Sequence, residues 1–371
     1  MANEIYDIPF TQIVEDVMFE VREAGFADPN VEKKFQRRVN YVYQNLIPAE
    51  FEFWDFMKKR GQFALGTVLQ TGTVAVTLNS TTVTYATGGL TTNAYAGYIF
   101  QVPSTDETYE IASNTATTFT LTQAYIGATN SAASFRVFKT IYSLASDFNL
   151  MTTEPGFWYE ISGGRQYLDW DDESDWSRNY TTQPSSVVRS IREYTERSSS
   201  GLFQVEVSPP PTESRFIRYE YYKSLPELRE FTTGTATTTA ASTSVTLSAD
   251  YSANISAGMY FRVDSGAVWK KITGVSGANL TLESAYPTSY VAKAYTVCDA
   301  PNIPNYLHMA IFFGACMLSA QDQGDASNTS SFAAQYKMLI AKALAKQNKK
   351  RYGRKILRFS SQPVRRGLGY R

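Results

Sequence analysis

Two stretches of the chain alternate apolar residues with threonine and serine, a pattern typical of half-buried β-strands. The two-residue period is clearest in 118–122 and in 279–283. Strand-like runs recur about every ten residues and are separated by residues that favour turns, mainly Gly, Asn, Asp and Ser. The pattern predicts a small antiparallel sandwich or barrel in each stretch.

The two stretches are similar in sequence to each other. Residues 96–102 (AGYIFQV) correspond to 257–263 (AGMYFRV), and the offset stays at 161 residues as far as Tyr125 and Tyr286. It is 162 residues upstream and 160 downstream, as expected when loops of a duplicated module differ in length. We therefore predict two related all-β modules.

Both ends of the chain instead show the period of amphipathic helices. Thr11 is expected to cap the first helix, with Glu15 and Asp16 in its first turn, where the helix dipole favours acids. Apolar residues then recur every three or four positions from Val31 to Leu46 after a turn at 28–30. The predicted helices cover about 11–21, 31–46, 306–321 and 330–346, with a break at Gly324.

A mixed segment lies between the β modules. Residues 202–207 and 216–222 alternate as strands on either side of Pro209–Pro211, and we predict that they form a hairpin. The expected fold class is α+β, a discontinuous helical core with a small antiparallel sheet and two inserted sandwich- or barrel-like β modules. The predicted parts are a core of 1–65, 140–230 and 300–346, modules at 66–139 and 231–299, and a basic C-terminal arm at 347–371.

The formal net charge of zero conceals a strong asymmetry. Residues 326–371 contain twelve basic residues and no acidic one, so the preceding part carries −12. Apolar side chains interleaved with these bases favour docking on an acidic protein surface, with DNA contact and a solvated tail as alternatives. The predicted docking residues are Lys349, Lys350, Arg351, Tyr352, Arg354, Lys355, Arg358, Phe359, Arg365, Arg366, Tyr370 and Arg371.

The densest acidic cluster lies at 169–175. Alternate carboxylates could bind Ca²⁺, but Ser174 replaces the glycine of an EF-hand loop and Tyr180 stands at its twelfth position. We expect a solvated turn that could dock a basic partner. Its acids are Asp169, Asp171, Asp172, Glu173 and Asp175.

Little in the sequence indicates catalysis. The single histidine, His308, lies near the start of an apolar helix, where packing or capping is the more common role. Cys298 and Cys316 do not have zinc-site spacing, and no phosphate-binding loop or nucleophile elbow occurs. The chain is therefore predicted to be no enzyme and to need no metal or cofactor. A glycosidase using 169–175 is disfavoured because nearly adjacent acids would not flank a cleft.

Targeting signals are also not expected. The first ten residues contain neither a basic region nor a long apolar one. The most apolar stretch, Met309–Leu318, has ten residues, well short of the ~20 that a helix needs to cross a bilayer. We expect no membrane partner.

The order of these elements resembles the head–tail connector proteins of tailed bacteriophages, of the adaptor, tail tubular protein A or gatekeeper type. The resemblance covers the 228 residues outside the β modules. It rests on a short helical N-terminus, an aromatic segment, the strands around Pro209–Pro211, and an apolar helix followed by a basic end. The residues that carry it are 51–56 (FEFWDF), 216–222 (FIRYEYY), 225–228 (LPEL), 303–310 (IPNYLHMA), Gly314, Ala315, Asp325 and Tyr336.

The resemblance implies a structural virion protein at the head–tail junction, assembled in the host cytoplasm. A ring of copies, twelve in the family, would dock on the portal protein through the C-terminal arm. It would receive a downstream tail or nozzle protein and pass genome DNA without sequence specificity during packaging and ejection. The alternative is a carbohydrate- or surface-binding virion protein that uses aromatic residues of the paired modules. The candidates are Tyr95, Tyr98, Tyr260 and Trp269.

Overall fold

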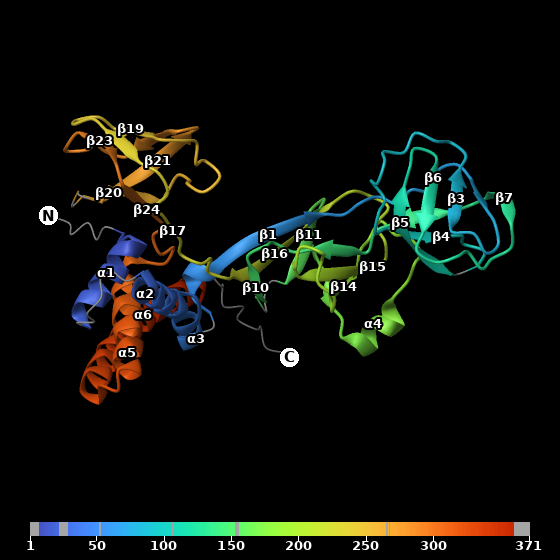
Figure 1. Ribbon diagram of the computed structural model, residues 1–371. Helices are drawn as coiled ribbons and strands as arrows, with labels where there is room; N and C mark the ends of the chain where they lie inside the picture. The colour runs from blue at the N-terminus through green and yellow to red at the C-terminus, as the bar shows by residue number, and fades with distance from the viewer. Residues whose placement is uncertain are drawn as a thin grey trace, which may run out of the picture. The chain divides into compact units, whose positions relative to one another are not determined.

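The computed structural model has an α+β fold and describes residues 7–21, 29–51, 53–105, 107–152, 156–264, 266 and 268–359 (Figure 1). Pro29 and 348–359 are described by their backbone alone. Contacts divide the chain into two compact units. One unit consists of Met1–Phe56 with Leu225–Arg371, and the other of Met57–Ser224.

The helices lie mainly in the first unit. The first helix, α1, begins after Pro9, and its buried face is the predicted one, with Ile13, Val14 and Val17. Thr11 does not cap it, because the residue lies inside the helix and its hydroxyl donates to Glu230 Oε2 at 2.9 Å. The first turn contains no acid. The elements are α1 (Phe10–Glu20), α2 (Pro29–Tyr41), η1 (Val42–Leu46), α3 (Ile47–Glu50), η2 (Asp55–Met57), η3 (Asn305–Leu307), α5 (His308–Asp322) and α6 (Ala326–Phe359).

The apolar spacing after residue 31 produces a π-helical turn. Phe35, Val39 and Tyr43 are buried as predicted, and the turn η1 follows α2 directly. A π turn has more residues per turn than an α-helix. Apolar residues spaced by four positions therefore stay on the side of the helix that faces the core. Val42 packs closely here: a Cβ on Gly314 of α5 would lie 2.7 Å from its Cγ1. This contact requires glycine at residue 314.

Helices α5 and α6 are separated at Gly324, as predicted, where φ is +73°. The predicted last helix is too short. The structure extends α6 over 34 residues to Phe359, about 51 Å at 1.5 Å per residue. The lysines and arginines of 349–358 are themselves good helix formers, which favours the continuation.

The two repeated segments have the same sheet topology. If β2–β8 are matched in order to β18–β24, the strands β7-β2-β3-β6-β5-β4-β8 correspond one by one to β23-β18-β19-β22-β21-β20-β24, and β17 adds a further strand to the second sheet. The strands of the first module are β2 (Val74–Val76), β3 (Thr82–Tyr85), β4 (Ile99–Gln101), β5 (Thr108–Asn114), β6 (Thr118–Leu121), β7 (Asn130–Ala133) and β8 (Arg136–Phe138). Those of the second are β17 (Glu230–Phe231), β18 (Ala236–Thr238), β19 (Ser244–Leu247), β20 (Tyr260–Val263), β21 (Lys270–Ser276), β22 (Asn279–Leu282), β23 (Tyr290–Lys293) and β24 (Tyr295–Cys298).

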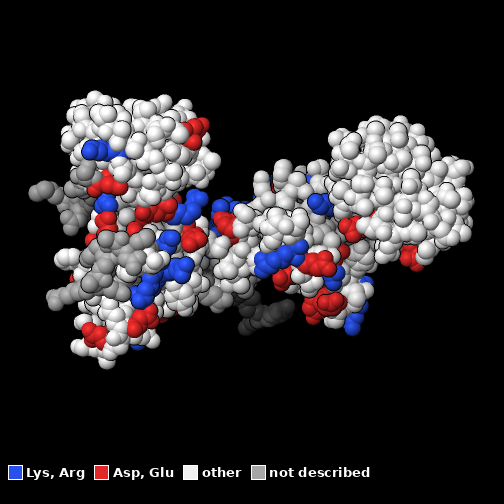
Figure 2. Space-filling view, in the orientation of Figure 1, with Lys and Arg blue, Asp and Glu red and all other residues white. Residues whose placement is uncertain are grey.

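Local details repeat as well. The register shift after Ile111 in β5 recurs after Ile272 in β21. Gly97 and Gly258 both have positive φ, and their N–H groups donate to Ile111 and Ile272 at 2.8 Å. Each module encloses its own apolar cluster. The visible face of the first module has almost no charged side chains (Figure 2).

The rest of the second unit is built from two sheets with one core. Strand β1 pairs with β16 along its length, from Lys58 opposite Tyr222 to Ala64 opposite Phe216. Ile191 and Val207 of one sheet and Tyr219 of the other belong to one buried cluster. The sheets are β1-β16-β11-β12, with β10 on β16, and β13-β14-β15-β9. Their elements are β1 (Lys58–Ala64), β9 (Ile141–Ser143), β10 (Phe148–Met151), β11 (Phe157–Ile161), β12 (Gly164–Tyr167), β13 (Asp169–Trp170), β14 (Ser190–Tyr194), β15 (Gln204–Ser208) and β16 (Phe216–Lys223), with helix α4 (Glu173–Asn179).

The predicted hairpin is wrong. Both of its strands exist, but β15 pairs with β14 and β9, whereas β16 pairs with β1, β10 and β11. The prolines Pro209–Pro211 between them have no N–H for a hairpin ladder, and the chain passes there from one sheet to the other. Side chains on both faces of β16 are buried, as expected of a strand packed on each side.

The expected single discontinuous core is also divided. Residues 58–64 and 216–223 belong to the second unit, whereas Leu225 and Leu228 are buried in the first. Asn40 fixes the latter segment, because its side chain donates to the Leu228 carbonyl at 3.1 Å and accepts from the Leu228 N–H at 2.8 Å. The division therefore falls between Ser224 and Leu225.

The repeated glycines give a stability test. We expect Gly97→Ala and Gly258→Ala each to destabilise its module by about 1–2 kcal/mol, because a Cβ is strained at positive φ. Amide hydrogen exchange of peptides from each module measures the effect. Gly164→Ala is the control, since Gly164 has no positive φ and no atom within 4 Å of its added Cβ. Unchanged exchange in the two variants would contradict the strain argument.

Candidate protein-docking surfaces

The base of the predicted basic arm is fixed on the helical unit. Gln347 is buried, and its Nε2 donates to the carbonyl of Phe53 at 2.8 Å. The neighbouring Lys346 places its Nζ 4.4 Å from the ring centroid of Tyr306, which lies in η3. A cavity of about 230 Å³ lies beside these residues, lined also by Asp55 and Phe56. We predicted that the core ends at 346 and the arm begins at 347, but α6 continues through this boundary.

The docking residues predicted in the arm lie mostly beyond what the structure describes. For 349–359 the backbone is helical and the side chains are not described. Arg365, Arg366, Tyr370 and Arg371 lie outside the described residues. The residues that sequence reasoning missed are Lys346, Gln347 and Tyr306, since nothing in the chain indicates that they meet.

The acidic segment is mostly exposed, but it forms a short strand and the start of a helix rather than the turn that we predicted. Asp169 lies in β13, which pairs with β14, and Asp171 is buried and accepts a hydrogen bond from Asn179 Nδ2 at 3.2 Å. Asp172 caps α4, accepting from the N–H groups of Ser174 and Asp175 at 2.9 Å. These hydrogen bonds, first that from Asp175, lower the pKa of Asp172.

Four of the five carboxylates of this segment are exposed, and only Asp171 is buried. The side chain of Glu173 is 91% exposed and that of Asp175 57% exposed, each 3.9 Å from an arginine. Among the described residues, no group of three or more His, Cys, Asp or Glu is arranged to hold a metal ion. Asp171 and Asp172 have structural contacts, and docking of a basic partner on the exposed acids of the segment stays a prediction.

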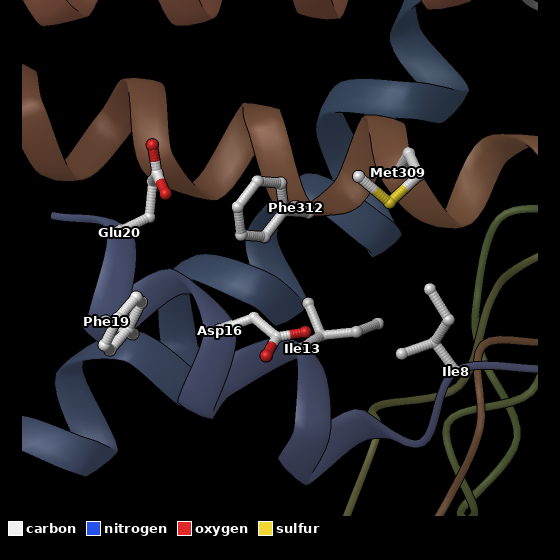
Figure 3. A pocket seen from close by; sticks show the side chains of 7 residues that line it. All are labelled: Ile8, Ile13, Asp16, Phe19, Glu20, Met309 and Phe312. Atoms are coloured by element: carbon white, nitrogen blue, oxygen red, sulfur yellow. The ribbon is translucent and has the colours of Figure 1, made fainter.

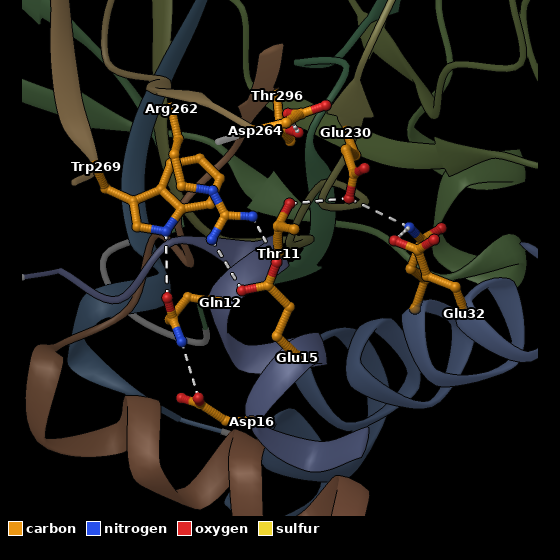
Figure 4. A network of polar contacts seen from close by, with 11 residues as sticks. Thr11, Gln12, Glu15, Asp16, Glu32, Glu230, Arg262, Asp264, Trp269 and Thr296 are labelled. Carbon is orange, nitrogen blue, oxygen red and sulfur yellow. Dashed lines mark hydrogen bonds and ion pairs between the residues drawn. The ribbon is translucent and has the colours of Figure 1, made fainter. Parts of the chain in front are cut away.

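A polar network joins α1 to the second β module (Figure 4). The guanidinium of Arg262 on β20 contacts both carboxylate oxygens of Glu15, with Nη1 3.0 Å from Oε2. It also stacks 4.4 Å from the ring centroid of Trp269, whose Nε1 donates to Gln12 at 3.2 Å. The paired oxygens and the flat ring fit a planar guanidinium, which lysine could not replace.

The first module uses the same position for an outside contact. Gln101 on β4 is the equivalent of Arg262 on β20, and it is buried. Its Nε2 donates to Thr182 Oγ1, outside the module, at 3.1 Å. Both copies thus contact the rest of their unit through one equivalent strand position, although the chemistry differs.

The aromatic residues considered for carbohydrate binding have partners within the chain. Tyr95 and Tyr98 pack against the core of the first module. Tyr260 donates its hydroxyl to Asp7 at 3.1 Å, and Trp269 is held by Arg262 and Gln12. All four therefore have contacts within the chain, and binding of a carbohydrate by them stays a prediction.

His308 and the two cysteines are structural. His308 is fully buried: its Nδ1 accepts from the Ile8 N–H at 3.2 Å and its Nε2 donates to the Ile303 carbonyl at 3.1 Å. Burial lowers the pKa of His308, so the ring is neutral near pH 7. Burial raises the pKa of both Cys298 and Cys316 to about 12.

An apolar groove lies between α1 and α5 (Figure 3). Its volume is about 230 Å³. Phe19 is 76% exposed and Met309 41% exposed, although both are large apolar side chains. The sequence signal was a phenylalanine off the buried face of an amphipathic helix. The lining residues are Ile8, Ile13, Asp16, Phe19, Glu20, Met309 and Phe312.

Comparison with known proteins does not assign the chain to a family. No family model matches it, and no curated protein is significantly similar to it. None of the helices that the structure describes is long and apolar enough to cross a membrane.

Arg262 gives a test of the network. We expect Arg262→Met to destabilise the attachment of the second module by about 1–2 kcal/mol, because Glu15 loses a two-point partner at a half-exposed site. Faster amide hydrogen exchange in α1 and β20 would report this loss. Lys293→Met removes the same charge from an exposed position of the same module and should have no such effect. Equal exchange in both variants would contradict the assigned role.

Glu230 gives a pH test. Burial raises the pKa of Glu230 above its ordinary value of 4.5, so the folded protein binds this proton more tightly than the unfolded chain. Its stabilising contribution is present below pH 4.5 and is lost as pH rises through the folded pKa. Glu230→Gln should therefore unfold at a higher temperature than the parent at pH 7, and the difference should shrink toward pH 4.5. The exposed Glu283→Gln is the control, and a pH-independent difference would argue against this cause.

Proposed function

We propose that the protein is a structural component of a bacteriophage virion, a head-to-tail adaptor that forms a ring and docks on the portal through its C-terminal segment. Helix α6 is the observation that carries the proposal. Its first part packs in the helical unit through the buried residues Phe332, Tyr336 and Ile340. Further along the helix, the side chain of Gln347 donates a hydrogen bond to the Phe53 carbonyl. The basic residues follow without a break in the helix.

The helix refines how the portal would be gripped. At 3.6 residues per turn, positions 351, 354, 355 and 358 share one side of α6, and these are Arg351, Arg354, Lys355 and Arg358. Positions 352, 356 and 359, all apolar or aromatic, share the adjacent side. This is the sequence of an amphipathic helix, which suits a groove with an acidic rim on the partner. The proposed arm thus begins as a helix.

Ring geometry supplies the strength of attachment. Head-to-tail contacts between copies close into a ring when the rotation between them allows it. Each docked helix would then raise the effective concentration of its neighbours at the portal. In this proposal the helices and the two-sheet body form the adaptor core, the β modules are insertions, and the lumen passes genome DNA to the next tail component.

The test uses the full-length protein and the portal ring of the same phage. Charge reversal at Arg351, Arg354, Lys355 and Arg358 should weaken co-sedimentation with the portal at least about tenfold, because docked charge pairs are replaced by repulsion. Lys337→Glu with Lys342→Glu, two exposed bases nearer the start of α6, is the matched control and should bind normally. Native mass gives the number of copies bound.

Two results would count against the proposal. One is a parent protein whose native mass does not change when portal is added. The other is full portal binding after deletion of 349–371, a cut that leaves the Gln347 contact in place.

A further inference from the structure

The groove between α1 and α5 has the chemistry of a docking site for a short chain segment. Five of its seven lining residues are apolar, and two of these, Phe19 and Met309, are exposed (Figure 3). Single exposed apolar side chains are common on protein surfaces, but an apolar groove bordered by several is typical of an interaction site. A volume of about 230 Å³ can hold one or two large side chains.

The groove carries negative charge, which indicates what kind of segment could bind there. Asp16 and Glu20 are one helical turn apart on α1, and no basic residue is among the seven that line the groove. Asp16 is exposed, and its pKa is raised by desolvation and by the neighbouring Glu15 carboxylate, although Gln12 donates to it at 2.8 Å. A positively charged neighbour would stabilise both carboxylates. The occupant should therefore combine apolar and basic side chains.

One stretch of the chain outside the described residues has this composition. Residues 1–6 contain Glu4 and no Lys or Arg, and 22–28 carry a net charge of −1. Residues 360–371 contain no acid. Their three arginines are Arg365, Arg366 and Arg371, interleaved with Val364, Leu368 and Tyr370.

The course of α6 favours a groove on another copy. Gln347 contacts Phe53, and the helix then continues for twelve residues to Phe359, about 18 Å. The last twelve residues, which can span about 40 Å when extended, would have to reverse direction to reach the α1–α5 groove of their own chain. A neighbouring copy requires no reversal.

We propose that residues 360–371 of one copy occupy the α1–α5 groove of a second copy, with the apolar side chains in the groove and the arginines against Asp16 and Glu20. The inference rests on the proposed ring. It assigns the last twelve residues to contacts between copies and leaves the helical residues 349–359 to the portal. Tail and groove are different surfaces, so the contact is head-to-tail and can close into a ring.

Two full-length variants with different affinity tags test the inference without portal. The tail variant is Arg365→Glu with Arg366→Glu, and the groove variant is Phe19→Ser with Glu20→Lys, at two exposed positions. Sedimentation should show the parent self-associating and each variant weakened at least about tenfold, as expected when an anchor residue or its charged partner is lost. Lys337→Glu with Lys342→Glu is the control for added negative charge and should associate like the parent.

Mixing the two variants distinguishes the two possible arrangements. If the tail binds a second copy, the intact tail of the groove variant fits the intact groove of the tail variant, and the tagged pair is recovered together. If each tail binds its own groove, mixing yields no pair, which overturns the proposal. A parent that stays monomeric at all concentrations, or a groove variant that associates normally, overturns it too. Both variants keep 349–359, so they should still co-sediment with the portal, although more weakly than the parent because neighbouring copies no longer hold one another. Loss of self-association with retained portal binding thus separates failure here from failure of the portal proposal.

Discussion

The close approach of three helical segments at Gly314 is the constraint on which both proposed docking surfaces depend. A Cβ at this position would lie 2.7 Å from Val42, so glycine is needed for η1 to approach α5 this closely, and Tyr336 of α6 contacts the same point at 3.4 Å. This packing sets one side of the α1–α5 groove, through Met309 and Phe312 of α5. It also fixes the first half of α6, from which the basic segment continues. A shift of α5 would change the groove and the base of the basic helix together.

The paired β modules show how a duplicated domain acquires different attachments. Strand order, register shift and the positive-φ glycines are the same in both copies, because each module encloses its own core. The outward position shared by Gln101 and Arg262 differs: a buried amide contacts Thr182 in one copy, and a guanidinium contacts Glu15 and Trp269 in the other. The core was kept after duplication, and the contact surface changed.

The acidic and basic segments illustrate how far charge alone can be interpreted. A cluster of acids at 169–175 looked like a single solvated feature, yet Asp171 is buried and Asp172 caps a helix. Helix N-termini select aspartate for the same reason that a partner's arginine would, since both offer N–H donors to a carboxylate. A dense cluster of acids in the sequence therefore could not show which of them cap a helix and which are free to bind a partner. The basic segment differs, because twelve bases in 46 residues without one acid exceed what capping can use.

The periodicity of the sequence was enough to predict the buried helical faces around Ile13, Phe35 and Tyr336. It also predicted the strands of both β modules and the repeat that relates them. These depend on neighbours within a few residues, or on comparison of one segment with another. The sequence also indicated the polarity of charge along the chain. Tertiary structure alone decided that β15 and β16 lie in different sheets, that α6 continues past Lys346, and that Phe19 and Met309 border one groove. Each of these results from packing between residues far apart in the chain, which no local pattern specifies.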